Sequence, residues 1–589
     1  MLVVPFLLAV ATATSVSSAA PTPTTVTPAG TYTGKACPQS PTYAQYLGIP
    51  FAKPPTGDLR FAAPVAYDGP FKSNVTQMPP ACYQNAFSGF PVPANQSEDC
   101  LFLNVYAPVI RPAKPLPVRF FIYGGGFQSG DVSSHYYDGC QAVRRAAPPT
   151  DSIVVTVNYR VGPQGFLAHP VFAAADGSVG NYGFLDQQLA LKWVKANIRQ
   201  FGGDPAKVVI FGESAGGNSV FAHMAAPSSA GLFSAAVSQS GLAVGMFPKD
   251  VAAEVAREFA NNAGCTSGDV ASCLRSLPPA AILNASMVSP SLGQPGYKFT
   301  DILKYGTPDY GLVQDAVTFP NVSRDAFLSG EFNKVPVLAG TNLKEANLFL
   351  PRHNFTEDDY KTYISDSFPA NLTSAVSALY PLSAMSPAAA ISQIATDRWM
   401  ACPSRRDLKA IAAAGVPTYA YLYNVTLSCN FIPGVPSKLL GPSHYSEIPL
   451  VFDFTTFAGP CTATQAEQDL ALAMGIAWTS MAERGRPFND TAATWPQYPG
   501  YEDLSVAGPT AVTTEKQLDY WNPRCAIFDQ IDWPYVITQT NYTTQSNGTG
   551  AASTPSGSSS GSNTNSASAP AGHIAPAMMV VVVLALAIL

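Results

Sequence analysis

The feature that most constrains the fold is an apolar run at residues 208–211 that ends abruptly in Gly-Glu-Ser-Ala-Gly at residues 212–216. This G-x-S-x-G pattern is typical of a sharp strand-to-helix turn that holds a nucleophilic serine above a sheet. Side chains two residues either side of Ser214 would clash in such a turn, and glycine removes both clashes. Residues 217–225 then predict a helix whose N-terminus lies beneath the serine and favours developing negative charge. The pattern therefore predicts an α/β sheet with Ser214 as a nucleophile.

A nucleophilic serine needs a base, and the chain contains six histidines. In the usual order of an α/β sheet with this turn, serine comes first, the acid second and the histidine last. Five histidines lie in a C-terminal tail, on the predicted helix of the serine, before the serine, or beside a glycosylation sequon: His573, His223, His135, His169 and His353. His444 remains, in a Gly/Pro-containing loop at residues 441–449. Elimination therefore makes His444 the expected base.

The acid should lie between Ser214 and His444 in the chain. Residues 335–342 have the composition of a buried strand that runs into a turn, and Glu345 follows directly. Functional groups of α/β sheets gather at the carboxyl ends of strands. A carboxylate at this place would hold the imidazole in the correct tautomer and stabilise its cation. Glu345 is therefore the expected acid.

Acyl transfer also requires hydrogen-bond donors for the oxyanion of the tetrahedral intermediate. Residues 119–123 have strand character and are followed by three consecutive glycines at positions 124–126. Such a turn allows bare backbone N–H groups to converge on one oxygen. The amides of Gly125, Gly126 and Ala215 are the predicted oxyanion hole.

Several segments of the chain match one family pattern together. They are SEDCLFLNV at residues 97–105, the serine motif at 211–217, and the blocks at 157–162, 180–187 and 201–205. On these motifs the chain resembles the type-B carboxylesterase and cholinesterase family of α/β-hydrolases, over roughly residues 30–535. The resemblance implies an α/β-hydrolase fold, with a mostly parallel central sheet flanked by helices in one large domain.

The resemblance also implies roles for individual residues. It places the catalytic triad on Ser214, Glu345 and His444, and gives Glu213 and Ser240 supporting positions beside the triad. It further implies two structural ion pairs, Arg60 with Glu98 and Arg160 with Asp186, whose value is positional more than energetic.

The expected activity is hydrolysis of carboxylic esters through an acyl-enzyme. The same resemblance includes catalytically silent cell-surface binding and adhesion proteins, but every catalytic position is filled here. No tryptophan lies between Cys82 and Cys100, where cholinesterases carry the ring that binds a quaternary ammonium group. Leu348 occupies the position of an aromatic residue of the cholinesterase gorge. We therefore expect neutral carboxylic or lipid esters, rather than choline esters, as substrates.

The composition supports one large exported enzyme. The chain has 589 residues, of which 47% are hydrophobic and 12% charged, with a net charge of −6 and no basic run. Nucleic-acid binding is therefore not expected. No cysteine and histidine cluster has the spacing of a zinc site, and the mechanism needs no metal or other cofactor. One catalytic domain is predicted at residues 20–544.

Both ends of the chain have the composition of targeting segments. Residues 1–19 resemble a secretory signal peptide, with an apolar stretch followed by small residues. Residues 545–573 are rich in Ser, Gly and Thr and predict a flexible stalk. Residues 574–589 are apolar but shorter than the about 20 residues of a usual membrane-spanning helix. This arrangement favours a glycosylphosphatidylinositol anchor in the outer leaflet, with a membrane-inserted tail as the alternative.

An exported chain can carry disulfides and N-linked glycans. The family resemblance implies the disulfides Cys82–Cys100, Cys265–Cys273 and Cys402–Cys525. Cys429 with Cys461 would flank the His444 loop and limit its motion, and subtraction leaves Cys37 with Cys140. Ten N-x-S/T sequons are present, at Asn74, Asn95, Asn284, Asn321, Asn354, Asn371, Asn424, Asn489, Asn541 and Asn547.

Overall fold

The computed structural model describes most of residues 23–530. The described ranges are 23–69, 71–85, 92–146, 151–243, 246–286, 310–350, 354–432, 434–454, 461–487, 495–504, 512–514 and 521–530. The chain divides into two units, residues 1–539 and 540–589. The predicted signal peptide, stalk and anchor segment lie outside the described residues.

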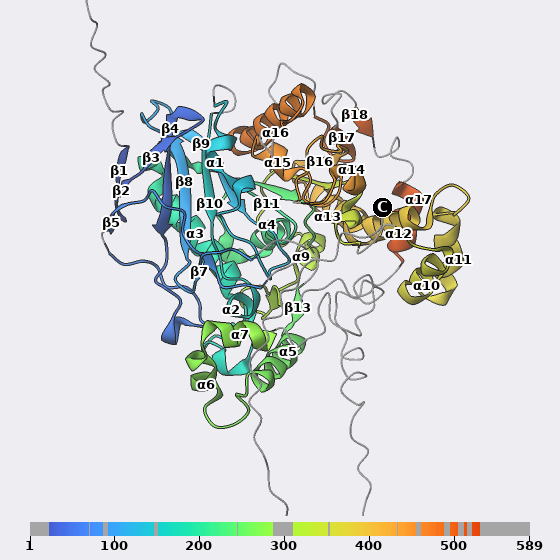
Figure 1. The fold of residues 1–589 in the computed structure, drawn as a ribbon, viewed down its shortest axis with the longest axis horizontal. Coiled ribbons are helices and arrows are strands. Elements are labelled where there is room, and N and C mark those ends of the chain that lie inside the picture. Colours follow the sequence, from blue (N-terminus) through green and yellow to red (C-terminus); the bar gives the residue numbers. More distant parts are fainter. Residues whose placement is uncertain are drawn as a thin grey trace, which may run out of the picture. The chain divides into compact units, whose positions relative to one another are not determined.

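An eleven-stranded sheet forms the centre of the first unit (Figure 1). Its strand order is β18-β17-β16-β15-β12-β11-β9-β10-β8-β4-β3. The strands from β10 across to β17 run parallel to one another, and antiparallel strands complete both edges. The bounds are β3 Lys35–Cys37, β4 Ser40–Pro50, β8 Phe102–Pro108, β9 Leu116–Ile122, β10 Ile153–Val157, β11 Gly203–Glu213, β12 Ala235–Gln239, β15 Val337–Asn342, β16 Thr418–Tyr423, β17 Gly500–Leu504 and β18 Val512–Thr514. This mostly parallel sheet confirms the predicted α/β class.

The central strands are apolar because helices cover the sheet on both faces. Every residue of β10, β12, β15 and β16 is buried. Parallel strands in such a position lack the polar alternation of a half-exposed sheet. The parallel register pairs Gly212 of β11 with Ile122 of β9, so both strands end at the same level. The serine turn and the glycine turn therefore leave the sheet side by side.

Three smaller sheets lie outside the central one. They comprise β1 Thr24–Thr27, β2 Gly30–Thr33 and β5 Phe71–Asn74, then β13 Phe247–Pro248 with β14 Val313–Gln314, and β6 Ala81–Cys82 with β7 Gln96–Ser97. The helices are α1 Gly139–Ala142, α2 Gly162–Phe166, α3 Tyr182–Asn197, α4 Ala215–Ala225, α5 Lys249–Asn262, α6 Val270–Ser276, α7 Pro279–Ser286, α9 Ser323–Ser329, α10 Glu357–Ser367, α11 Ala370–Leu379, α12 Pro387–Thr396, α13 Cys402–Ala413, α14 Ser437–Leu440, α15 Ile448–Val451, α16 Gln465–Arg484 and α17 Trp521–Phe528.

The longest helix shows how local sequence sets the element ends. α16 begins at a capping box, in which the side chains of Thr464 and Glu467 accept hydrogen bonds from each other's backbone N–H groups. It ends before Gly485, which adopts the left-handed conformation (φ 69°) that glycine tolerates without strain. α16, α4 and α13 pack directly on strands of the central sheet.

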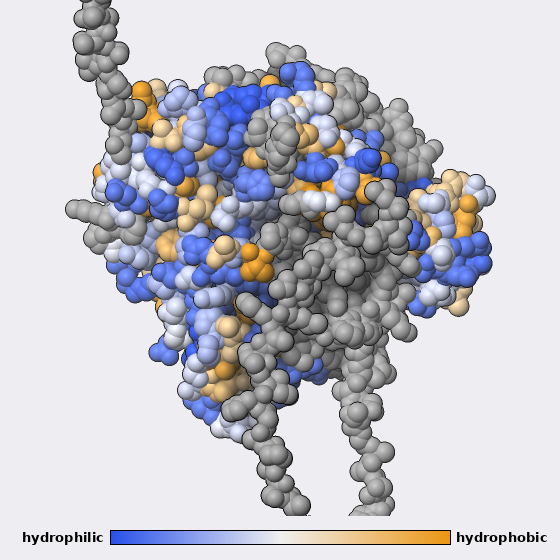
Figure 2. Space-filling view, viewed as in Figure 1, coloured by the Kyte–Doolittle hydropathy of each residue, from blue (hydrophilic) through white to orange (hydrophobic). Residues whose placement is uncertain are grey.

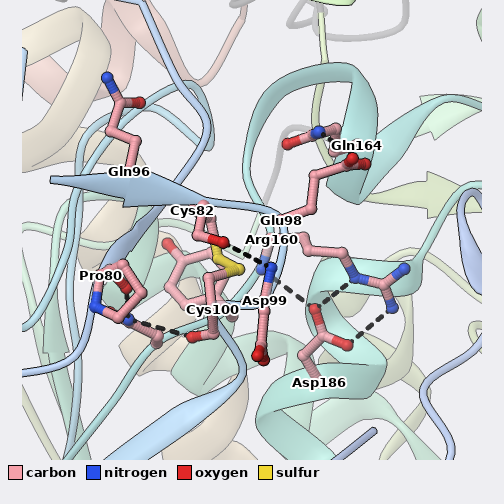
Figure 3. The surroundings of a disulfide bond; sticks show 12 residues. Pro80, Cys82, Gln96, Glu98, Asp99, Cys100, Arg160, Gln164 and Asp186 are labelled. Atoms are coloured by element: carbon pink, nitrogen blue, oxygen red, sulfur yellow. Dashed lines mark hydrogen bonds and ion pairs between the residues drawn. A yellow bond between two sulfur atoms is a disulfide. The ribbon is translucent and has the colours of Figure 1, made fainter. Parts of the chain in front are cut away.

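Five disulfides tie the surface segments to this core. They join the cysteines in the expected pairs: Cys37–Cys140, Cys82–Cys100, Cys265–Cys273, Cys402–Cys525 and Cys429–Cys461. Figure 3 shows Cys82–Cys100 with the buried pair of Arg160 and Asp186 beside it. The Arg160 Nη2 atom lies 2.7 Å from Asp186 Oδ1, and Arg60 Nη2 lies 2.6 Å from Glu98 Oε2. Both predicted ion pairs are therefore present.

Most of the sequon asparagines in the described residues lie on the surface. Of the sequon asparagines in the described residues, Asn321 is half-buried and six are exposed: Asn74, Asn95, Asn284, Asn354, Asn371 and Asn424. Asn489, Asn541 and Asn547 lie outside the described residues. Hydrophobic residues on the described part of the face in Figure 2 form small patches among hydrophilic ones. Within the described ranges, none of the helices combines the length and apolar character needed to span a bilayer.

Candidate active site

The serine turn has the strained geometry that its sequence predicts. β11 ends at Glu213, α4 begins at Ala215, and Ser214 between them has φ 58° and ψ −124°. A methyl group on Gly212 would lie 2.6 Å from the carbonyl oxygen of Ile122, and one on Gly216 would approach the same oxygen more closely. Both glycines are therefore required for β9 to lie next to the turn. Ser214 is half-buried, whereas its two neighbours in the chain are buried.

Glu345 and His444 meet at the end of β15. Glu345 opens a short 3₁₀ helix, Glu345–Leu348, just after the strand, and is fully buried. Its Oε2 atom lies 2.7 Å from His444 Nδ1. Its Oε1 atom accepts two hydrogen bonds, each 2.6 Å long, from the Ser240 hydroxyl and the Asn342 backbone N–H. The carboxylate is thus fixed from three sides, and it favours the tautomer in which Nδ1 carries the proton.

This tautomer leaves the Nε2 atom of His444 as the proton acceptor. Nε2 makes no hydrogen bond within the described part of the chain. It lies 3.1 Å from Glu213 Oε1, but the two atoms are not aligned as a hydrogen bond. No hydrogen bond joins Ser214 to His444 in the described residues. Catalytic hydrogen bonds are often long or poorly aligned before substrate binds, so this geometry does not exclude His444 as the base.

Glu213 and His444 affect each other's protonation. Burial raises the pKa of Glu213 to about 8, against the opposing effect of His444. Burial by itself would lower the pKa of His444, but the carboxylates of Glu213 and Glu345 outweigh it and raise that pKa. A charged Glu213 therefore holds a proton on His444, whereas a protonated Glu213 leaves the imidazole free to accept one.

The glycine turn after β9 packs directly against the nucleophile. A methyl group on Gly124 would lie 2.9 Å from the Cβ atom of Ser214. Gly125 (φ 100°) and Gly126 (φ 64°) have left-handed backbones, and Gly125 accepts hydrogen bonds that close the turn. Among the described residues, the amides of Gly125, Gly126 and Ala215 donate no hydrogen bond to the chain itself. Backbone amides without a partner in the chain are the kind of donor that an oxyanion hole requires.

Comparison with known proteins agrees with this geometry. The model of the "Carboxylesterase family" matches residues 21–526. The chain belongs to this family. Liver carboxylesterase 1 of Oryctolagus cuniculus is 31% identical over 519 residues, which cover 81% of this chain and 87% of that protein. Fumonisin B1 esterase of Sphingopyxis macrogoltabida is 32% identical over 480 residues, which cover 79% of this chain and 83% of that protein.

The family membership confirms two predictions made from the sequence. The fold is that of the α/β-hydrolases, and the enzyme class is carboxylic ester hydrolase.

The structure also brings functional neighbours to the site that sequence reasoning missed. The ring of Phe349 packs against the His444 imidazole, with the ring centroids 5.0 Å apart. Phe349 follows Leu348, which the sequence had singled out together with Glu345, whereas Phe349 itself was not predicted. No spacing rule indicated this contact, because Glu345–Leu348 is a 3₁₀ helix, in which residues three apart share a face, and Phe349 lies just beyond it.

A buried polar network lies under the histidine loop and was also missed. Glu447 accepts hydrogen bonds from Asn342 Nδ2 (2.6 Å) and Gln239 Nε2 (3.1 Å). Gln239 in turn accepts a hydrogen bond from Trp478 Nε1 of α16 (3.0 Å). Through Glu447, the network joins the ends of β12 and β15 to the loop that carries His444. His444 lies three residues before Glu447. The members of the network come from four distant parts of the chain, so no local pattern indicated it.

Proposed function

We propose that this carboxylic ester hydrolase works through an acyl-enzyme on Ser214, with His444 as base and Glu345 as the acid that orients it. The observation that carries the proposal is the short contact between Glu345 Oε2 and His444 Nδ1, at the end of the strand two places from β11. A buried carboxylate that holds an imidazole beside a strained serine is the arrangement that nucleophilic acyl transfer needs.

The chemistry follows from these positions. His444 Nε2 accepts the proton of the Ser214 hydroxyl as its oxygen attacks the ester carbonyl carbon. The carbonyl oxygen becomes an anion that the amides of Gly125, Gly126 and Ala215 bind. The intermediate then expels the alcohol, which takes the proton from His444. Water repeats the sequence on the acyl-enzyme, releases the carboxylic acid and restores the serine.

We propose neutral carboxylic or lipid esters as the substrates. Leu348 and Phe349 are half-buried apolar side chains, and Phe349 packs on the base itself. The apolar ring on the base favours an uncharged ester, and the segment between Cys82 and Cys100 contains no tryptophan for a cationic one.

We further propose that the enzyme acts outside the cell, tethered to the outer leaflet. Five disulfides are typical of an oxidising compartment, and six exposed sequons suit glycosylation. In this proposal residues 1–19 are removed, residues 20–544 form the catalytic domain, and residues 545–573 are the stalk. Residues 574–589 would then direct attachment of the lipid anchor.

Hydrolysis of two butyrate esters tests the catalytic and substrate proposals together. The purified enzyme should cleave p-nitrophenyl butyrate with a higher kcat/KM than butyrylcholine. Ser214→Ala should abolish both reactions, while Ser267→Ala, a change at an exposed serine, should leave them unchanged. Full activity in Ser214→Ala would refute the assigned nucleophile, and a preference for the choline ester would refute the substrate class. A folded wild-type enzyme without esterase activity would instead favour a silent binding protein on this scaffold.

A further inference from the structure

The loop that carries His444 continues as one hydrogen-bonded unit up to Asp453. Backbone hydrogen bonds run from the N–H of residue 446 to the carbonyl of Ser443, and through the turns of α15 to the N–H of Asp453. The first and last bonds of this series are 3.1 and 3.0 Å long. A continuous series of backbone hydrogen bonds therefore connects Asp453 with the turn that carries His444.

The end of this unit is held by an unusual ionic contact. Asp453 has a left-handed backbone (φ 55°), which is uncommon for a residue other than glycine. Its carboxylate, only 11% exposed, lies 3.0 Å from Arg144 Nη2 and 2.7 Å from Arg145 Nε. Arg145 Nη2 donates a second hydrogen bond to the same carboxylate, and Arg144 Nε donates to the Asp453 carbonyl oxygen at 3.0 Å. The surroundings therefore hold Asp453 in a conformation that its backbone alone disfavours.

The segment that precedes Arg144 and Arg145 is attached to the central sheet at two points. The two arginines follow α1 (Gly139–Ala142), which the disulfide Cys37–Cys140 joins to the edge of the central sheet. The Nη2 atom of the buried Arg119, on β9, donates to the carbonyl oxygen of Ala142 at 3.0 Å. β9 is also the strand that leads into the glycine turn next to Ser214. Contacts through Arg144 and Arg145 therefore connect the end of the histidine loop to β9, the strand that precedes the glycine turn.

We propose that Asp453 is a positioning residue for the base. Its contacts with Arg144 and Arg145 set the place of the 443–453 unit and thereby of His444 relative to Ser214. The inference rests on the proposed role of His444. Misplacement of a catalytic group by about 1 Å can lower the rate about 100-fold, so a small shift of this unit is sufficient to be measured.

A second set of contacts keeps the unit folded without Asp453. Phe452 packs its ring on Phe121 of β9 and Phe211 of β11, with centroids 4.9 and 6.0 Å apart. These apolar contacts hold the segment on the sheet, whereas the ionic contact sets its exact position. Variants of Asp453 should therefore fold, which makes a kinetic test informative.

Two replacements of Asp453 separate positioning from stability. Asp453→Asn removes the charge, and Asp453→Gly removes all carboxylate contacts while relieving the left-handed backbone and keeping the carbonyl that Arg144 contacts. Both should lower kcat for p-nitrophenyl butyrate about 10- to 100-fold with KM within about twofold. Asp453→Gly should remain folded at the assay temperature, because the Phe452 contacts persist. The matched control is Glu483→Gln, which breaks a comparable cluster with Lys114 and Lys207 away from the histidine loop and should keep kcat.

A double variant tests whether Asp453 acts through Arg145. If it does, Asp453→Asn with Arg145→Gln should lower kcat no more than the larger single effect. Additive losses, an unchanged kcat in Asp453→Gly, or losses that only follow the unfolded fraction would overturn the inference. Its failure is distinct from failure of the proposed function, which would appear as full activity in Ser214→Ala.

Discussion

Replacing Glu345 by glutamine should disable the base while leaving the fold intact. The Oε1 position receives two donors, the Ser240 hydroxyl and the Asn342 N–H. The amide oxygen of the glutamine must take this position, because an NH₂ group there would face two donors. The NH₂ group then lies at the Oε2 position and donates to His444 Nδ1. The proton of the imidazole is thereby forced onto Nε2, the atom that has to accept the proton of Ser214.

The expected loss in kcat follows from the distance between the Glu345 carboxylate and the His444 imidazole. In the wild type the carboxylate lies 2.7 Å from Nδ1. At an effective dielectric constant of about 20, two unit charges at this separation interact by about 6 kcal/mol. At about 1.4 kcal/mol for each factor of ten, this corresponds to about four orders of magnitude in rate. We therefore expect kcat of Glu345→Gln to fall about 10⁴-fold.

Initial rates with p-nitrophenyl butyrate and a melting curve measure the two halves of this prediction. Glutamine has the shape of glutamate, so the melting temperature should change by only a few degrees. Glu331→Gln, at an exposed glutamate, is the control and should match the wild type in both assays. A kcat within tenfold of the wild type would refute the reasoning and mean that another carboxylate orients His444.

Three further predictions concern protonation, packing and anchoring. Glu213→Gln removes a carboxylate that raises the pKa of His444. Since the base is inactive when protonated, the acid limb of the kcat/KM profile should move to lower pH, and an unchanged or higher midpoint would contradict the coupling. Gly216→Ala would press a methyl group onto the Ile122 carbonyl oxygen and should strongly lower the melting temperature. Gly475→Ala, which meets open space in α16, should instead stabilise the enzyme by about 0.5–1 kcal/mol. Phosphatidylinositol-specific phospholipase C should release esterase activity from intact cells, and a mature C-terminal peptide that still ends at Leu589 would rule the lipid anchor out.

The parts of the site that the sequence predicted are those with a local signature. The serine turn depends on two glycines within five residues, and the oxyanion turn on three consecutive ones, so each could be recognised in isolation. Glu345 could be placed because it directly follows a buried strand. His444 needed elimination among six histidines, since nothing in its own loop sequence requires it to reach Glu345, 99 residues away.

The parts that could not be predicted depend on contacts between distant segments. Arg144 and Arg145 meet Asp453 more than 300 residues later, and neither segment has a pattern that names the other. The mutual effect of Glu213 and His444 on their pKa values likewise arises only after burial brings the two side chains together. Protonation of the site is therefore a property of the packed structure, even where each residue is recognisable in the sequence.

The central claim is that Ser214 is the nucleophile, and covalent labelling tests it most directly. The native enzyme would be treated with a fluorophosphonate until esterase activity stops, then digested and mapped by mass spectrometry. We expect one phosphonyl group for each chain, on the peptide that contains Ser214, and no labelling of the Ser214→Ala variant. An adduct on a different residue, or full inactivation with Ser214 unmodified, would contradict the claim.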